Sequence, residues 1–188
     1  MENTEKPPRS SEASSDSELL GGLEGNIYLI GFMGAGKSYI GHKLALELGR
    51  PFADLDTWIE TTAGQPIKKI FEQHGESTFR QMEADHLRKS KPHQHLVVAT
   101  GGGTPCFHSN MEWMLSHGRV VFLDPPIETL MRRLESERAH RPLLGLDFRR
   151  SVTQRLAERR PIYQKAHLIV DGDNDEQAIL RLIQKSLD

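Results

Sequence analysis

Residues 31–38 read Gly-Phe-Met-Gly-Ala-Gly-Lys-Ser, and this stretch decides the fold. Its spacing is Gly-x-x-x-x-Gly-Lys-Ser, and it follows the apolar run Asn26–Ile30 and precedes a helical pattern over Lys37–Leu48. In a P-loop, such glycines let backbone N–H groups curl around a polyphosphate, and the N-terminus of the following helix adds positive partial charge. The stretch therefore predicts a nucleotide-binding loop between a buried strand and a helix.

The side chains of this loop predict how the nucleotide is held. We expect Lys37 to reach the β- and γ-phosphates of ATP, and the hydroxyl of Ser38 to hold Mg²⁺. The expected ATP contacts in the loop are Gly34, Ala35, Gly36, Lys37, Ser38 and Tyr39. The alternative is a glycine-rich turn that binds nothing, and the flanking strand and helix make it the weaker reading.

Length and composition restrict the class of protein. The chain has 188 residues, the size of one domain, and its single cysteine, Cys106, cannot form an internal disulfide. No apolar stretch approaches the roughly 20 residues of a membrane helix, and a net charge of −2 argues against general nucleic-acid binding. We expect a cytoplasmic monomer with no membrane or nucleic-acid partner.

The first 24 residues differ from the rest of the chain. They are rich in Ser, Glu and Pro and almost lack large apolar side chains, which predicts a disordered tail. The acidic residues in this segment argue against a secretory signal or an organelle transit peptide. Residues 25–188 are expected to form a single domain.

Strand-like runs and helical patterns alternate along this domain. The expected strands are Asn26–Ile30, Phe52–Leu55, Leu96–Thr100, Arg119–Leu123 and His167–Val170. The expected helices are Lys37–Leu48, Ile67–His74, Thr78–Ser90, Met111–His117, Ile127–Arg138 and Glu176–Leu187. The alternation predicts an α/β, three-layer P-loop fold in which helices cover both faces of a parallel five-stranded sheet. Functional loops of such a sheet lie at the carboxyl ends of its strands.

An arginine-rich region interrupts this alternation. Nine arginines lie between Arg132 and Arg160 against four acidic residues, which predicts an anionic ligand there; a solvated basic helix face is the alternative. Within it, residues 139–147 carry a proline, a glycine and no clear period. We expect a lid over about residues 138–149, from which Arg141 closes over the transferring phosphate.

Two carboxylates end the second expected strand. On an extended chain, Asp54 and Asp56 point the same way. One could lie near Mg²⁺ while the other accepts a hydrogen bond from a substrate hydroxyl, as phosphoryl transfer to an alcohol requires. Asp56 could instead, or in addition, be the N-cap of a following helix.

Two further motifs contain candidate ligands for a substrate. Arg80 and Glu83 are three residues apart on an expected helix whose inward face carries Phe79, and they could form only a surface ion pair. Gly101, Gly102 and Gly103 follow the third expected strand, where a substrate could lie against bare backbone; a flexible loop is the weaker alternative.

Together these motifs resemble the shikimate kinase family. The pattern comprises the P-loop, the Asp-x-Asp pair, the Phe-Arg-x-x-Glu helix, the three glycines, Arg141-Pro142-Leu143-Leu144, and an Arg-x-Pro-x-Tyr element read as Arg159-Arg160-Pro161-Ile162-Tyr163. Order and approximate spacing are kept from about Ile27 to the C-terminus. One departure is Tyr39, where many P-loop kinases have a second hydroxyl residue.

The resemblance implies a kinase that transfers the γ-phosphate of ATP to the 3-hydroxyl of shikimate, in the route to chorismate and the aromatic amino acids. It implies Lys37, Asp56 and Arg141 as catalytic residues and Arg138 and Arg141 as ATP contacts beyond the loop. It assigns shikimate to Asp56, Arg80, Gly101, Gly102, Gly103 and Arg159. It places Asp54 near the water shell of Mg²⁺ and leaves Arg159 and Arg160 as alternatives for the carboxylate.

Two other functions remain as alternatives. A kinase for another small acceptor, such as gluconate or a nucleoside monophosphate, shares the fold. A GTP-dependent switch needs an Asn-Lys-x-Asp motif, and the sequence has no Asn-Lys pair.

Overall fold

The computed structural model describes residues 25–90, 95–137 and 145–187. Its five-stranded sheet has the order β2-β3-β1-β4-β5, and every neighbouring pair of strands is parallel. The strands are β1 (Asn26–Ile30), β2 (Phe52–Asp54), β3 (Val97–Ala99), β4 (Gly118–Leu123) and β5 (Leu168–Val170). The predicted fold class is confirmed, and all five predicted strands are present with ends shifted by at most one residue.

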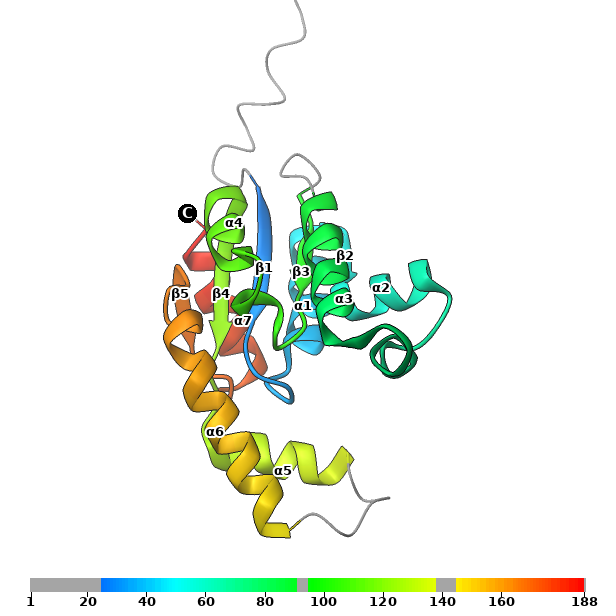
Figure 1. Cartoon of the computed structure of the whole chain (residues 1–188). Coiled ribbons are helices and arrows are strands. Elements are labelled where there is room, and N and C mark those ends of the chain that lie inside the picture. Colours follow the sequence, from blue (N-terminus) through cyan, green and yellow to red (C-terminus); the bar gives the residue numbers. More distant parts are fainter. Residues whose placement is uncertain (1–24, 91–94, 138–144, 188) are drawn as a thin grey trace, which may run out of the picture.

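Helices cover both faces of the sheet (Figure 1). They are α1 (Lys37–Leu48), α2 (Leu55–Ala63), α3 (Ile67–Lys89), α4 (Asn110–His117), α5 (Ile127–Glu137), α6 (Gly145–Tyr163) and α7 (Glu176–Lys185), with a 3-10 turn at Thr104–Cys106. Helices α1 and α7 pack together on one face, and α4 packs on β4 from the other. Helices α5 and α6 pack against each other and project beyond the carboxyl end of β4.

The sequence reading was wrong at one place. Helix α2 begins at Leu55, so Asp56 lies in its first turn and not on an extended strand, and the N-cap is Asp54. Helix α6 begins at Gly145, so residues 145–149 of the expected lid are helical. Helix α3 joins the two predicted helices across a break at Gly75, where φ is 77°.

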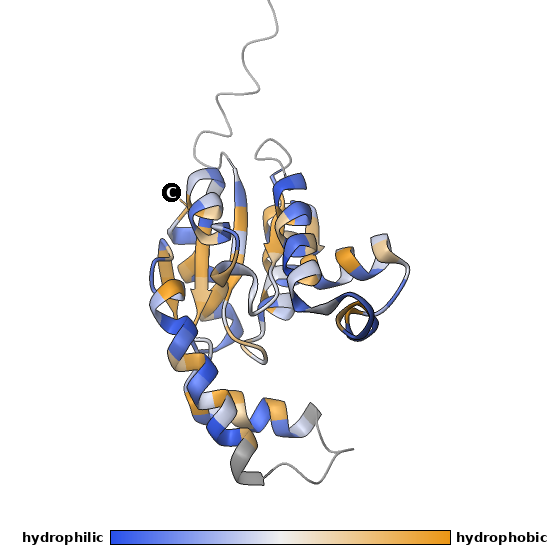
Figure 2. Cartoon of the chain, viewed as in Figure 1, coloured by the Kyte–Doolittle hydropathy of each residue, from blue (hydrophilic) through white to orange (hydrophobic). Residues whose placement is uncertain are grey.

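The described core lies around the central strands. Every residue of β1 is buried, and Val120–Leu123 of β4 are buried beside it. Apolar colour accordingly gathers on the strands, while α6 is largely hydrophilic (Figure 2). A second, smaller cluster joins α2 to α3 and contains Leu55, Ile59, Ile70 and Phe79. Among the described helices, none is both long and apolar enough to cross a membrane.

Several predictions lie outside the described residues. The expected disordered tail covers residues 1–24, and the first seven residues of the expected lid are 138–144, including Arg138 and Arg141. These remain predictions.

Candidate active site

The P-loop joins β1 to α1 as the sequence predicts. Gly36 is the N-cap of α1 and has a φ of 92°, a left-handed conformation that glycine adopts without strain. Lys37 is buried, and its Nζ donates hydrogen bonds to the carbonyl oxygens of Gly31 and Phe32, at 2.9 and 2.8 Å. The lysine thus bridges its own loop, where a phosphate oxygen can replace a carbonyl as the acceptor.

Burial shifts the acid–base behaviour of this lysine. Desolvation lowers the pKa of Lys37 to about 8, although the nearby carboxylates of Asp56 and Asp54 act in the opposite direction. The pKa of a lysine in such a setting shifts readily when a phosphate binds, because charges act strongly on one another where the local dielectric constant is low.

Ser38, in the first turn of α1, is hydrogen-bonded to Asp54 at the end of β2. The Oγ of Ser38 lies 2.5 Å from Oδ2 of Asp54, and Oδ1 of Asp54 accepts hydrogen bonds from the backbone N–H groups of Asp56 and Thr57. A hydroxyl and a carboxylate are the oxygen donors that Mg²⁺ prefers beside a polyphosphate. The two residues therefore fit a magnesium ion held mostly by phosphates and water.

Asp56 lies in the first turn of α2 and lines a pocket. Its Oδ1 is buried and has no hydrogen-bond partner among the described residues. Burial, with help from the charges of Asp54 and Glu83, raises the pKa of Asp56 to about 6, while Lys37 acts in the opposite direction. A buried carboxylate oxygen without a partner is suited to accept a hydrogen bond from a ligand hydroxyl.

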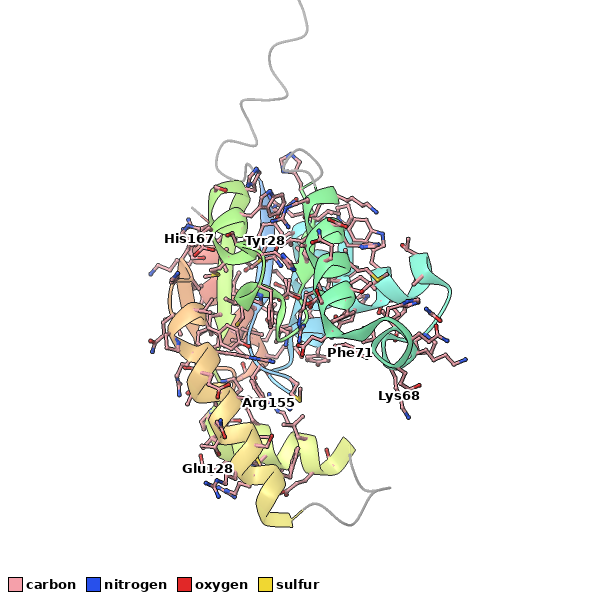
Figure 3. The ribbon with its side chains drawn as sticks, in the orientation of Figure 1. Tyr28, Lys68, Phe71, Glu128, Arg155 and His167 are labelled. Carbon is pink, nitrogen blue, oxygen red and sulfur yellow. The ribbon has the colours of Figure 1, made fainter. Side chains whose placement is uncertain are left out.

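The pocket that Asp56 faces has a volume of about 640 Å³, and we call it the acceptor pocket. Figure 3 labels two of its lining residues, Phe71 on α3 and Arg155 on α6. The described charged residues that line it are Asp56, Glu76, Arg80, Glu83, Arg155, Glu158 and Arg159. Helix α6, which is far in sequence from the neighbouring helices α2 and α3, thus contributes to the same pocket.

Arg80 lines this pocket, and its ion pair with Glu83 is buried. Its Nη1 lies 2.7 Å from Oε2 of Glu83, whose side chain is only 1% exposed. Its guanidinium also lies over the ring of Phe107, 4.5 Å from the ring centroid. The alternative of a solvated pair is therefore wrong for these residues.

The three glycines form part of the pocket wall. A Cβ atom at Gly103 would lie 2.5 Å from Nη1 of Arg80, so the guanidinium rests directly on bare backbone. A Cβ atom at Gly102 would lie 3.3 Å from the backbone nitrogen of Met33 in the P-loop and 3.6 Å from Nη1 of Arg159. The loop therefore lies between the P-loop and α6.

Arg159 and Arg160 have different surroundings. Arg159 lines the acceptor pocket, and its guanidinium lies 5.7 Å from the ring centroid of Phe32. Arg160 forms an ion pair with Asp124, which follows β4. Tyr163, one turn beyond Arg159, donates a hydrogen bond to the carbonyl of Gly102. This register directs Arg159, and not Arg160, into the acceptor pocket.

A second pocket, of about 410 Å³, lies on the other side of the P-loop. Its lining includes Gly34, Gly36, Tyr39, Arg133 and Asn174, so we call it the nucleotide pocket. Sequence reasoning missed Arg133, because it is one of nine arginines in its region and nothing in that pattern separates it from the others. The hydroxyl of Tyr39 donates a hydrogen bond to Glu176 at the start of α7.

Comparison with known proteins agrees with these motifs. The family model described as shikimate kinase matches residues 33–188. The chain belongs to the shikimate kinase family. A curated shikimate kinase from Salinibacter ruber (strain DSM 13855 / M31) is 38% identical over 168 residues, which cover 84% of this chain and 82% of that protein.

Solved shikimate kinases have the same fold. The structure from Bacteroides thetaiotaomicron gives a TM-score of 0.78 at 34% identity and covers 85% of this chain and 96% of that one. The structure from Acinetobacter baumannii in complex with shikimate gives 0.76 at 37% identity and covers 86% of this chain and 94% of that one. Shikimate kinases are ATP-dependent enzymes that phosphorylate a hydroxyl of shikimate.

In this member of the shikimate kinase family, most of the predicted site residues meet around the P-loop. Asp56, Arg80, Arg159 and the three glycines line the acceptor pocket, and Gly34, Ala35, Gly36 and Tyr39 line the nucleotide pocket. Cys106 packs partly against the core and also lines the acceptor pocket.

Proposed function

We propose that this chain transfers the γ-phosphate of ATP to the 3-hydroxyl of shikimate, giving shikimate 3-phosphate and ADP. One observation carries the proposal beyond family membership. Asp56 and Arg159 line one pocket, and the wall of that pocket at Gly102 lies against the P-loop. An acceptor held there by its carboxylate and hydroxyls is next to the phosphates that the loop binds.

The acceptor pocket supplies the contacts that shikimate needs. Arg80 and Arg159 bind the carboxylate, because a planar guanidinium matches two carboxylate oxygens. Asp56 accepts hydrogen bonds from the ring hydroxyls and takes the proton as the phosphoryl group is transferred. Gly101, Gly102 and Gly103 form the floor on which the ring lies.

The P-loop side supplies the contacts for ATP. Backbone N–H groups from Gly34 to Tyr39 surround the phosphates, and Lys37 stabilises charge on the β- and γ-phosphates. Ser38 would hold Mg²⁺, and Asp54 would bind it through water. When bound, the metal would supply positive charge for the phosphate oxygens. Arg133 lines the nucleotide pocket. Arg138 and Arg141, which lie outside the described residues, belong to a lid over about residues 138–149 that closes over the phosphate.

The setting of the enzyme is also part of the proposal. It acts in the cytoplasm as a monomer, on a small-molecule substrate, with no nucleic-acid or membrane partner. The single cysteine and the net charge of −2 support this setting.

The test is an assay of ADP release with shikimate, gluconate and nucleoside monophosphates as alternative acceptors. We expect turnover with shikimate alone, and product that shows phosphate at the 3-hydroxyl by NMR. Faster turnover with gluconate or a nucleoside monophosphate would replace shikimate as the acceptor while leaving the kinase assignment intact.

A further inference from the structure

Arg80 already has an exposed carboxylate on its guanidinium. Oε1 of Glu76 accepts hydrogen bonds from Nε and Nη2 of Arg80, at 3.1 and 2.8 Å. Glu76 lines the acceptor pocket and lies immediately after the break at Gly75. The edge of the guanidinium formed by Nε and Nη2 is therefore occupied by a residue of the same chain. Carboxylates commonly bind to such an edge.

Glu76 is not needed to hold this guanidinium in place. The side chain of Arg80 is 11% exposed and that of Glu83 1%, whereas that of Glu76 is 59% exposed. Glu83, the backbone at Gly103 and the ring of Phe107 already fix the guanidinium from other directions. An ion pair with an exposed partner contributes little and breaks easily, while the buried pair is retained.

The charge of the pocket also favours release of Glu76. Among the described residues, three arginines and four carboxylates line it, a formal balance of −1 when all are ionised. An anionic acceptor adds a further negative charge. Turning Glu76 out into solvent relieves this repulsion without breaking the Arg80–Glu83 pair.

We propose that Glu76 is a displaceable counter-ion that occupies Arg80 in the free enzyme and is displaced by the carboxylate of the acceptor. This rests on the proposed function, in which Arg80 binds that carboxylate. Glu76 is thus a residue that tunes affinity for the acceptor: it keeps the arginine paired while the pocket is empty, and it weakens binding of the acceptor by competing for the same N–H groups.

The test compares Glu76→Gln with Glu158→Gln. The first replacement keeps size and shape and weakens the contact with Arg80, because a neutral amide oxygen is a poorer acceptor for guanidinium than a carboxylate. The second removes a negative charge from the same pocket at a residue whose carboxylate accepts from Gln154. We expect Glu76→Gln to lower KM for shikimate by about 2- to 5-fold, with kcat and KM for ATP unchanged, and Glu158→Gln to lower it less.

A neutral analogue provides the second readout. With the carboxamide of shikimate, Glu76→Gln should give no gain, since this ligand does not compete for the charged contact. A raised KM for shikimate in Glu76→Gln overturns the proposal and makes Glu76 a positioning residue. A gain equal to that of Glu158→Gln, or an equal gain with the carboxamide, also overturns it and assigns the effect to general charge.

A separate variant distinguishes failure of this proposal from failure of the proposed function. Arg80→Lys should raise KM for shikimate whether or not Glu76 competes. If Arg80→Lys raises KM and Glu76→Gln does not lower it, only the counter-ion role is rejected. If Arg80→Lys leaves KM unchanged in a folded protein, both the role of Arg80 and the counter-ion role are rejected.

Discussion

Arg160 donates a hydrogen bond to the carboxylate of Asp124, and this pair ties α6 to the end of β4. Successive residues on a helix point about 100° apart, so the pair fixes the direction of the preceding side chain as well. Arg159 consequently lines the acceptor pocket beside Gly102. Two adjacent arginines that the sequence could not separate are thereby given different tasks.

The two arginines should respond differently to the same substitution. Arg159→Lys should raise KM for shikimate by about 30- to 150-fold, since loss of a charged hydrogen bond forfeits on the order of 2–3 kcal/mol. Arg160→Lys is the matched control and should leave KM within about 2-fold, because Arg160 and its partner Asp124 are not among the described residues that line the acceptor pocket. Steady-state kinetics of both variants check this, and the reverse order of effects would exchange their roles.

Lys37→Ala should keep the fold and lose turnover by about 10³-fold, because a preorganised charge on the transferring phosphate is lost. Thermal unfolding of the variant provides the control.

In the wild-type enzyme the pKa of Lys37 is about 8, so kcat/KM for ATP should fall as pH rises above 8 and the lysine loses its proton. A flat profile from pH 7 to 9.5 would contradict the charged role of Lys37.

Asp54 is the N-cap of α2, and we propose that it also binds Mg²⁺ through water; substitution can separate these two tasks. Asp54→Asn keeps a side chain able to cap α2 but removes the charge, so we expect near-normal stability and a Mg²⁺ requirement raised by about 10- to 100-fold. Asp54→Ala should show the same Mg²⁺ effect and also lose about 1 kcal/mol of stability with the cap. Titration of activity with Mg²⁺ and urea unfolding measure the two effects. An unchanged Mg²⁺ requirement in both variants would remove Asp54 from the metal site.

Asp56→Asn should abolish turnover while ATP still binds, because the amide keeps the shape but accepts no proton. In the wild-type enzyme, kcat/KM for shikimate should fall below pH 6, as the carboxyl with its raised pKa of about 6 takes up a proton. Calorimetric titration of ATP into the variant is the control. If ATP affinity is lost together with turnover, Asp56 belongs to the metal site, and Asp54 takes its place as the proton acceptor.

The Asp56→Asn substitution should also stabilise the folded protein at neutral pH. Burial raises the pKa of Asp56 from 3.8 to about 6, so the folded state binds this proton more tightly than the unfolded chain does. The protonated carboxyl of Asp56 makes its full contribution to stability below pH 4, and this contribution is lost as pH rises through 6. Asp56→Asn avoids that loss, so its unfolding free energy should exceed that of the wild type at pH 7 by up to about 3 kcal/mol, and the difference should shrink toward pH 4. The difference in unfolding free energy, variant minus wild type, should rise from pH 4 to pH 7. A difference that falls over this range would contradict the prediction.

The sequence predicts best the segments whose local chemistry allows one conformation. Strand Asn26–Ile30 and helix Lys37–Leu48 have the predicted bounds, since the glycines between them permit a tight turn and the apolar run has no polar side to expose. Helix α2 was missed because the Asp-x-Asp pattern suits an extended chain equally well. The helix begins there because Asp54 accepts capping hydrogen bonds from the backbone N–H groups of Asp56 and Thr57.

Residues that pair across the fold could not be predicted from spacing alone. The register before Pro161 favours Arg159 over Arg160 as a ligand, but no local pattern predicts that Arg160 pairs with Asp124 or that Arg133 lines the nucleotide pocket. Glu76 was also missed, although it lies four residues before Arg80 on α3, a spacing at which helical side chains form ion pairs.

The most direct test of the account is the coupling between Arg159 and the carboxylate of shikimate. It is measured as a cycle of four kcat/KM values, for the wild type and Arg159→Lys with shikimate and with its neutral carboxamide. We predict a large loss from either change alone and much less further loss when both are combined, because both remove the same contact. If the two losses multiply independently, Arg159 does not bind the carboxylate, and another acceptor becomes the better assignment for this kinase.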